Sequence, residues 1–299
     1  NDHASIGSSI AITRNGIRVS GDMFAAGATI TSRELAVAIA VDTPGEGVWT
    51  YALSAKTDPG GRAWISQPYL LGFKVSDAYS DSATGDFSYS TTSWSASPAS
   101  VTVNLGAGES LFLVGTAQVW NDYPSIGSSI AITRGDTRIS GDMFAAGATI
   151  ASRELAAAIA LDTPGGGVWT YALSAKTDPG GKAWISQPYV LAFKVSDVYS
   201  DSAVGDEYVS TTIWSPTDAS VQVPLGAGES LFLIGAAQVW NDRATVGSSI
   251  GICRDSVRVS GDMFAAGATI TRRELAIAIA VDKTGPVGTY TYPLSGKTD

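Results

Sequence analysis

Residues 35–41 have the sequence LAVAIAV and are followed by DTPG at residues 42–45. Bulky and small side chains alternate along this run, so one face of the segment carries large side chains and the other carries small ones. Ala and Leu also favour helices, but a period of two that ends in an Asp-Thr-Pro-Gly turn favours a β-strand. Copies of the run stand at residues 155–161 and 275–281. The sequence therefore predicts an all-β fold made of a repeated unit.

The repeat is domain-sized. The stretch GDMFAAGATI begins at Gly21, Gly141 and Gly261, so the copies lie 120 residues apart. A unit of this length can close a hydrophobic core of its own, which predicts tandem antiparallel β-sandwiches of jelly-roll type. The two ends fit no single unit, which indicates a processed chain or a window on a longer repetitive protein. The expected domains are residues 1–77, the second half of a sandwich; 78–197, a complete sandwich; and 198–299, a sandwich without its closing strand.

Strand and turn signals alternate within each copy, as in antiparallel sandwiches. A strand over Ser8–Arg14 ends at Asn15-Gly16, a dipeptide that tolerates the positive φ angles of a two-residue hairpin. Residues 48–56 and 64–75 also alternate and are expected to form strands. Residues 76–85 are polar, acidic and without periodicity, so we expect a linker between copies there.

Composition excludes several classes of partner. The net charge of −9 argues against nucleic acid, because phosphate binding depends on clustered Lys and Arg. The sequence contains no apolar run of about 18 residues, so no membrane span is expected. The single cysteine, Cys253, excludes a disulfide within the chain. Few charged residues and abundant Gly, Ser, Thr and Ala indicate an extracellular, cell-surface or virion-surface protein.

The order of features over residues 99–197 resembles a known family. Residues 101–109, VTVNLGAGE, lead into an apolar strand, a hairpin follows at residues 134–138, and LDTPG at residues 161–165 precedes a Trp-bearing strand. This order is similar to the jelly-roll domains related to tumour necrosis factor and to the globular heads of complement, in the form found in phage tail and bacterial surface proteins. The resemblance implies a sandwich of about eight strands that serves display or binding. It implies no catalytic residues.

An enzyme is not expected. The only histidine, His3, has no counterpart in the other copies, so no complete copy builds a His-dependent triad from its own side chains. No nucleophile-elbow, P-loop or zinc-protease motif is present. Asp77, Asp81 and Asp86 could offer oxygens to calcium, but their spacing fits no EF-hand loop, and a solvated polar loop is the simpler interpretation. We therefore expect no catalytic residue, no cofactor and no metal.

Tryptophan supplies the candidate binding residues. The eight tryptophans form matched pairs: Trp49 with Trp169, Trp64 with Trp184, Trp94 with Trp214, and Trp120 with Trp240. An exposed Trp can stack on a sugar ring, whereas a Trp within an apolar strand anchors a core or a contact between domains. Trp94 and Trp214 lie in Ser/Thr-rich segments and are the candidates for ligand binding. Trp64 and Trp184 are candidates for contacts between subunits.

A second candidate for subunit contacts is an Arg-Glu pair before each Leu/Ala strand. The pairs are Arg33 with Glu34, Arg153 with Glu154, and Arg273 with Glu274. Such a pair either forms a salt bridge between stacked units or is an exposed bridge that contributes about 0–1 kcal/mol.

These features lead to two hypotheses of function, one for a structural protein and one for a binding protein. The first is a non-enzymatic structural subunit of a fibre, in which incomplete sandwiches are completed by strands of neighbouring chains, so that the partner is the chain itself. The alternative is a carbohydrate-binding adhesin or phage receptor-binding protein, whose repeated sites would bind glycans with avidity.

Overall fold

The chain divides into two compact units, Asn1–Ser196 and Asp197–Asp299. The computed structural model describes residues 7–20, 23–25, 36–63, 65, 70–75, 77–145, 148–149, 153–203, 206–243, 245–260, 263–265, 274–283 and 286–298. These residues form strands and loops, so the all-β prediction is confirmed. Within this described part, no helix is long and apolar enough to cross a membrane.

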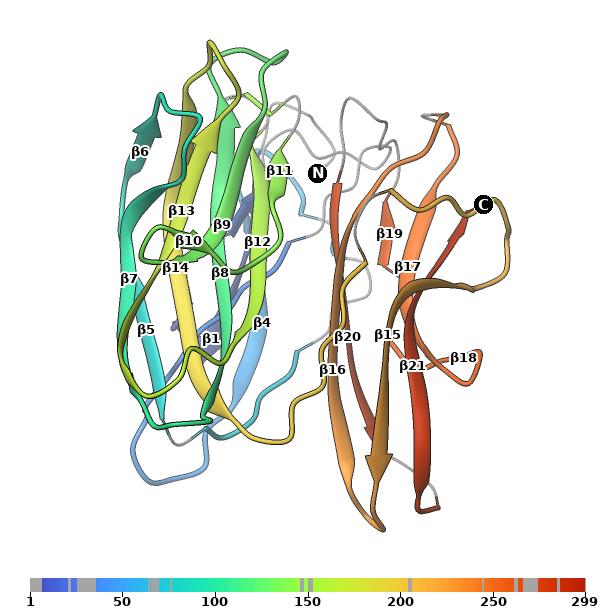
Figure 1. Cartoon of the computed structure of the whole chain (residues 1–299). Coiled ribbons are helices and arrows are strands. Elements are labelled where there is room, and N and C mark those ends of the chain that lie inside the picture. The colour runs from blue at the N-terminus through green and yellow to red at the C-terminus, as the bar shows by residue number, and fades with distance from the viewer. Residues whose placement is uncertain are drawn as a thin grey trace. The chain divides into compact units, whose positions relative to one another are not determined.

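The middle copy, in the first unit, is a sandwich of two antiparallel sheets (Figure 1). One sheet has the order β10 (Thr137–Arg138), β9 (Ser128–Arg134), β13 (Gly167–Thr177), β7 (Ser95–Leu105), with β11 (Met143–Ala145) also paired to β9. The other has the order β12 (Glu154–Asp162), β8 (Ser110–Asn121), β14 (Ala183–Val195), β5 (Ala78–Ser82), with β6 (Asp86–Tyr89) also paired to β14.

The core of this sandwich lies between its sheets. Alternate side chains of each strand point inward, so both sheets remove apolar area from water, at about 25 cal/mol per Å². The first sheet supplies fully buried Val103, Ile130, Ile132 and Leu173, and the second supplies Leu111, Leu113, Ile185 and Val190.

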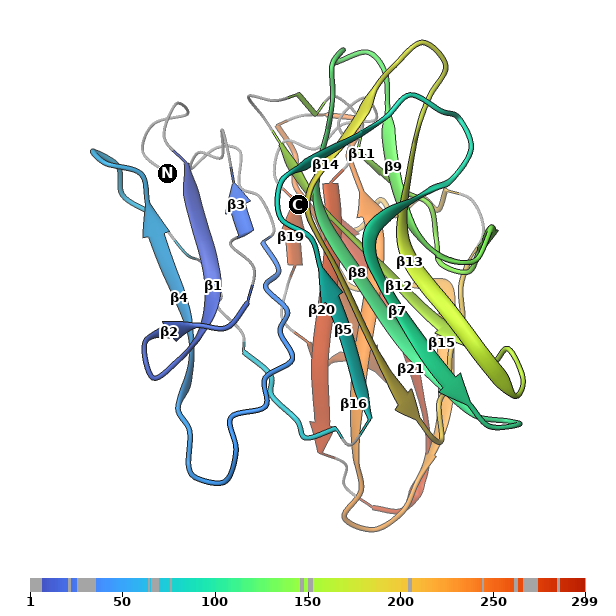
Figure 2. The ribbon, with the colours of Figure 1, turned by 90° about the vertical axis from the view of Figure 1, so that its left-hand side faces the viewer.

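The first half-copy forms a single sheet in the described residues. Its strands are β1 (Ser8–Arg14), β2 (Ile17–Arg18), β3 (Met23–Ala25) and β4 (Tyr51–Thr57), and Figure 2 shows β4, β1 and β3 side by side. The predicted strands at residues 35–41 and 64–75 are wrong for this copy, because residues 36–41 and 70–75 form none. Their counterparts β12 and β14 both pair with β8, whose sequence has no counterpart within residues 1–77.

The half-copy contacts the middle sandwich within the first unit, and two of the contacts involve β14. The Val41 amide donates a hydrogen bond of 3.2 Å to the Tyr189 hydroxyl. The Phe73 ring lies edge-on to Phe193, with centroids 5.5 Å apart. Residues of the half-copy therefore pack on β14.

The second unit repeats the sandwich with one smaller sheet. The larger sheet has the order β15 (Ser215–Leu225), β21 (Gly288–Thr298), β17 (Ser248–Arg254), β18 (Val257–Arg258), with β19 (Met263–Ala265) also paired to β17. The smaller contains β16 (Ser230–Val239) and β20 (Glu274–Lys283). Val223, Ile250, Ile252 and Ala278 are among its buried core residues.

The predicted hairpin turns are confirmed in all three copies. Asn15 and Gly16 have φ angles of 48° and 82°, and Gly135 has 53°. The third copy places Asp255 and Ser256 at 46° and 73°, although neither is glycine. Because the hairpin requires positive φ, these two residues carry a strain that glycine would not.

The prediction of a linker at residues 76–85 is wrong, because strand β5 lies within this segment. Residues 78–82 are a strand that pairs with β14, with Ser80 opposite Leu191. The segment has no hydrophobic periodicity, but it lies at the edge of a sheet, where backbone pairing alone places it. The equivalent residues 198–203 form no strand. The described part of the second unit likewise contains no strand of the β14 type.

Candidate functional site

Trp94, one of the two predicted sugar-stacking residues, lies against two cations. It precedes β7 and is partly buried. The Lys176 Nζ atom lies 4.7 Å from the centre of its ring, and the Arg138 guanidinium carbon lies 6.0 Å from it. Lys176 also forms a 2.7 Å ion pair with Asp142. Cation–π contacts, which contribute about 0.5–1 kcal/mol each at exposed positions, therefore hold the indole against the sheet.

Trp214 repeats this arrangement in the second unit. Arg258 and Lys297 lie over its ring at 5.4 and 5.3 Å. A Cβ atom added to Gly251 of β17 would approach the ring carbons of Trp214 to 3.2 Å, so the indole lies directly on that strand. The structure thus places both predicted residues in packed clusters. Their binding of sugars stays a prediction.

Trp184, predicted at a subunit contact, stacks on Trp120. The ring centroids are 6.0 Å apart and the planes differ by 3°. Lys182 Nζ lies 4.4 Å from the centre of the Trp184 ring, and the Arg153 guanidinium lies 4.1 Å from the centre of Trp120. The Trp184 Nε1 atom donates a 2.6 Å hydrogen bond to Asp122. These contacts form a stack of two indoles and two cations, which we call the tryptophan stack.

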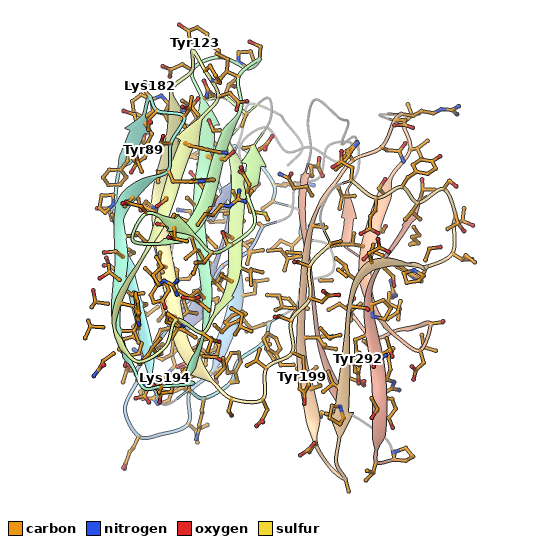
Figure 3. The ribbon with its side chains drawn as sticks, in the orientation of Figure 1. Tyr89, Tyr123, Lys182, Lys194, Tyr199 and Tyr292 are labelled. Atoms are coloured by element: carbon orange, nitrogen blue, oxygen red, sulfur yellow. The ribbon has the colours of Figure 1, made fainter. Side chains whose placement is uncertain are left out.

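The tryptophan stack lies toward one end of the middle sandwich. Figure 3 shows Lys182 at the end that carries Tyr123, with Lys194 at the opposite end. At that opposite end, Lys194 forms a 2.8 Å ion pair with Glu109. The hydrogen bond from Lys194 lowers the pKa of the Glu109 carboxyl, with a further contribution from the Gly106 amide. Cationic side chains at both ends therefore have partners within the sandwich.

The other predicted subunit contacts are described only in part. Arg153 lies 3.9 Å from Asp86, within its own sandwich. Glu154 and Glu274 begin β12 and β20, and their backbones pair with Val119 and Val239. Arg33, Glu34, Trp64 and Arg273 lie outside the described residues. The role of all these residues between subunits stays a prediction.

A cluster of Arg, Asp and Tyr recurs in all three copies and was missed by the sequence analysis. Its members are Arg14, Asp42 and Tyr51; Arg134, Asp162 and Tyr171; and Arg254, Asp282 and Tyr292. In copy order, the shortest Arg–Asp distances are 2.8, 2.7 and 2.7 Å. The tyrosine hydroxyls donate hydrogen bonds of 2.8, 2.9 and 2.8 Å to the same carboxylates. The recurrence of all three residue types, with Arg and Asp 28 positions apart in each copy, was the available signal.

Each arginine of these Arg–Asp–Tyr clusters also covers an aromatic ring. The guanidinium carbons lie 5.0 Å from the centre of Trp49, 4.9 Å from Trp169 and 5.5 Å from Tyr290. Trp49 and Trp169 are anchored by hydrogen bonds from Nε1 to the Gly45 and Gly165 carbonyls. In the middle copy the cluster joins Arg134 of β9 and Tyr171 of β13, in one sheet, to Asp162 of β12 in the other, which is a structural role.

Burial distinguishes the copies of this cluster. Tyr51 is 38% exposed, whereas Tyr171 and Tyr292 are 0% and 2% exposed. Burial, reinforced by the hydrogen bond to Asp162, raises the pKa of Tyr171. Burial, reinforced by Asp282, raises the pKa of Tyr292 to about 12. Both hydroxyls are therefore held protonated in the folded state.

We expect alkaline titration to reveal Tyr292 as a late-ionising tyrosine. A tyrosine in the unfolded chain ionises at about pH 10. Because the folded pKa of Tyr292 is raised above this value, the stability that its neutral hydroxyl contributes is fully present below about pH 10. It is lost as the pH rises through the folded pKa of about 12. Tyrosinate absorbance, with circular dichroism reporting the fold, measures this.

The variant Tyr292→Phe should remove tyrosinate absorbance from the high-pH phase of the titration and leave the phase at about pH 10 unchanged. Loss of the lower phase in Tyr292→Phe would show that the Asp282 hydrogen bond does not hold the proton.

A buried asparagine connects three segments of the middle sandwich. Asn121, at the end of β8, is 2% exposed. Its Nδ2 atom donates to the hydroxyls of Ser128 and Thr177, each at 3.0 Å. Its Oδ1 atom accepts from the amides of Tyr123 and Lys182 at 3.2 and 3.4 Å. Every polar group of this side chain is used, which explains an amide in an apolar strand.

Asp81, in the expected linker, and its counterpart Asp201 accept hydrogen bonds from backbone amides, including one each from β7 and β15. Asp81 accepts hydrogen bonds of 2.9 Å from the Ser82 and Ser100 amides. Asp201 does the same with Ser202 and Ser220, also at 2.9 Å. Among the residues that the structure describes, no group of three or more His, Cys, Asp or Glu side chains is placed to hold a metal ion.

The arrangement with the clearest capacity for binding is the open edge of β16. In the middle sandwich, β8 lies between β12 and β14. Its counterpart β16 pairs with β20 alone, and no other strand of the described residues pairs with it. Figure 1 shows β16 and β20 as neighbouring strands of the second unit. An edge of this kind presents backbone N–H and C=O groups that can pair with an added strand.

Comparisons with known proteins identify no family. No protein-family model matches the chain, and no curated protein matches it. Among solved structures, dimeric latent PorU from Porphyromonas gingivalis is similar over 97% of this chain, with 9% identity and a TM-score of 0.27. The chain spans 29% of that protein's length. A TM-score this low supports no conclusion about fold or function. The structure itself defines the class of protein, which is an all-β protein of packed antiparallel sheets.

Proposed function

We propose that this chain is a non-enzymatic structural subunit of an extracellular or virion-surface fibre. In the fibre, tandem β-sandwiches are completed by strands of neighbouring chains. The observation that carries the proposal is the open edge of β16, seen against the paired edge of β8. Backbone pairing at such an edge supplies affinity, and the side chains of the added strand supply specificity.

The symmetry of such a contact leads to a fibre. A strand given by one part of a chain to a different part of the next chain makes a head-to-tail contact, which extends into a filament unless the rotation closes a ring. The low share of charged residues, 16%, and the absence of an intramolecular disulfide fit a large exported β-protein with an adequate core. The fibre proposal therefore draws on two features, the open edge of β16 and the tandem repeat of the sandwich.

We expect Ile234→Lys in β16 to prevent assembly. The counterpart of Ile234 is Val114, which is 5% exposed and lies opposite Leu191 of β14. A charge at this position would be buried by an added strand, so its desolvation opposes docking. Sedimentation velocity and negative-stain microscopy should show filaments for the unmodified chain and discrete particles for the variant.

The matched control is Val168→Lys, because Val168 is 68% exposed on β13 of the closed sandwich. It should assemble like the unmodified chain. Equal assembly of both variants, or a compact monomer for the unmodified chain, would contradict strand completion. A native polypeptide with a mass far above 30.8 kDa would instead indicate completion by a longer repeat array.

The carbohydrate-binding alternative gains no specific contact from the structure, since Trp94 and Trp214 lie under Arg and Lys side chains. A glycan array tests it directly. Binding that disappears in Trp94→Ala, with the fold intact by circular dichroism, would make it the better proposal.

A further inference from the structure

The hairpin between β1 and β2 carries an asparagine followed by a glycine at its tip. Asn15 and Gly16 are both exposed, and Arg14 pairs with Ile17 across the turn, so the loop consists of these two residues. Apart from its chain neighbours, no heavy atom of the described residues lies within 4 Å of a Cβ atom built on Gly16. Packing therefore does not fix the peptide bond between the two residues, and local opening of the tip costs little free energy.

This pair of residues allows a reaction between the main chain and a side chain. The backbone nitrogen of Gly16 attacks Cγ of Asn15, and the new C–N bond closes a five-membered succinimide ring. The bond from Cγ to Nδ2 breaks, and the Nδ2 group leaves as ammonia with the proton that the Gly16 nitrogen has lost. Glycine favours the ring closure, because it has no Cβ atom to obstruct the attack and its φ angle turns freely.

The hairpin also places a hydrogen-bond donor on the reacting amide. The Asn15 Oδ1 atom accepts a 3.3 Å hydrogen bond from the Thr50 amide, which lies directly before β4. Negative charge develops on Oδ1 while the nitrogen attacks Cγ, and a donor at this oxygen stabilises that charge. The first copy thus combines an unobstructed nucleophile with a polarised side-chain amide.

The other two copies have the same turn with different residues at this position. Gly135 has a φ angle of 53° and offers no side chain to the reaction. Asp255 has a φ angle of 46°, and its amide donates a 3.3 Å hydrogen bond to the Thr291 carbonyl. The Asn15 amide makes the matching bond of 3.0 Å to the Thr50 carbonyl. The turn therefore accommodates an aspartate, the residue that loss of the asparagine amide would leave.

We infer that Asn15-Gly16 is a site of spontaneous deamidation, which gives the first copy a chemically changing turn that the other two copies lack. Water opens the succinimide at either of its two carbonyls. Opening at Cγ gives aspartate, which fits the turn as Asp255 does. Opening at the main-chain carbonyl of Asn15 gives isoaspartate, in which a methylene group joins the main chain. The longer loop no longer matches the pairing of Arg14 with Ile17.

Peptide mass mapping of the full chain, stored at neutral pH and raised temperature, follows the reaction. Replacement of the amide by a carboxyl raises the mass of the peptide that carries Asn15, and fragmentation of that peptide distinguishes aspartate from isoaspartate. Asn104 is the internal control, because it is exposed on β7 and is followed by the buried Leu105. We expect amide loss at Asn15 to be at least about tenfold faster, since strand pairing holds the Leu105 nitrogen in place. Equal rates at the two asparagines would overturn the inference.

Two variants of the full chain test the role of the glycine and the transfer of the site. Gly16→Ser introduces the residue of the third copy, where Ser256 has a φ angle of 73°, so the turn is retained. Its side chain obstructs ring closure and should slow amide loss at Asn15 by about tenfold. The paired changes Gly135→Asn and Asp136→Gly should create a second site in the middle copy that reacts at a rate similar to that of the first. Unchanged loss in Gly16→Ser, or no loss at the transferred site while circular dichroism shows the fold intact, would contradict the inference.

Discussion

Asn121→Ala should lower the free energy of unfolding of the middle sandwich by about 3 kcal/mol, because a buried polar group without a partner costs about 1–3 kcal/mol. The substitution removes an acceptor from two backbone amides and a donor from two buried hydroxyls. It also leaves a cavity where the amide stood, which adds to the loss. Urea unfolding followed by far-ultraviolet circular dichroism measures the change.

Asn104 provides the control for this substitution, because it lies on the exposed face of β7. Asn104→Ala should change the free energy of unfolding by less than about 0.5 kcal/mol, as surface substitutions usually do. A similar small change in Asn121→Ala would show that water replaces the lost hydrogen bonds at the end of β8.

Asp162→Ala is expected to have a comparable effect, a loss of about 2–4 kcal/mol, through the Arg–Asp–Tyr cluster. The substitution leaves the fully buried Tyr171 hydroxyl without its acceptor and Arg134 without its ion-pair partner. The exposed fraction of the Arg134 side chain, 24%, keeps the loss below that of a fully buried pair. The thermal unfolding midpoint of the chain, measured by tryptophan fluorescence, should fall by several degrees.

The same substitution in the first copy is the matched control. Asp42 makes the same two contacts, with Arg14 and Tyr51, but Tyr51 is 38% exposed and water replaces its lost hydrogen bond. Asp42→Ala should therefore cost less than Asp162→Ala, by about 1–3 kcal/mol, the cost of leaving a buried hydroxyl without its partner. Equal losses in the two variants would contradict burial as the source of the difference.

Local sequence signals predicted the elements that form from their own residues. The turn at Asn15-Gly16 recurs with positive φ in each copy, because its conformation is set by two residues. The apolar run of β8 was placed correctly, since its strand continues from Ser110 to Asn121. Likewise, β12 and β20 bear out the Leu/Ala strand in the second and third copies.

Elements and contacts that depend on a partner distant in the chain could not be predicted from the sequence. β5 was expected to be a linker, because its residues carry no period and its order comes from pairing with β14. The Arg–Asp–Tyr clusters bring together residues 28 positions apart in the chain, Arg134 and Asp162 for example. In the second and third copies their convergence follows from the packing of two sheets, which no short window of sequence reports.

The sequence by itself determined the all-β class, the period of 120 residues and the hairpin turns, because alternation and turn chemistry act over a few neighbouring residues. Only the tertiary structure decided which copies of the same sequence become strands. Residues 70–75 match residues 190–195 of β14 at four of six positions, yet β14 alone lies beside a strand that can accept its hydrogen bonds. A strand is stable only when its backbone groups are paired, so a closely similar sequence forms a strand in one copy and none in another.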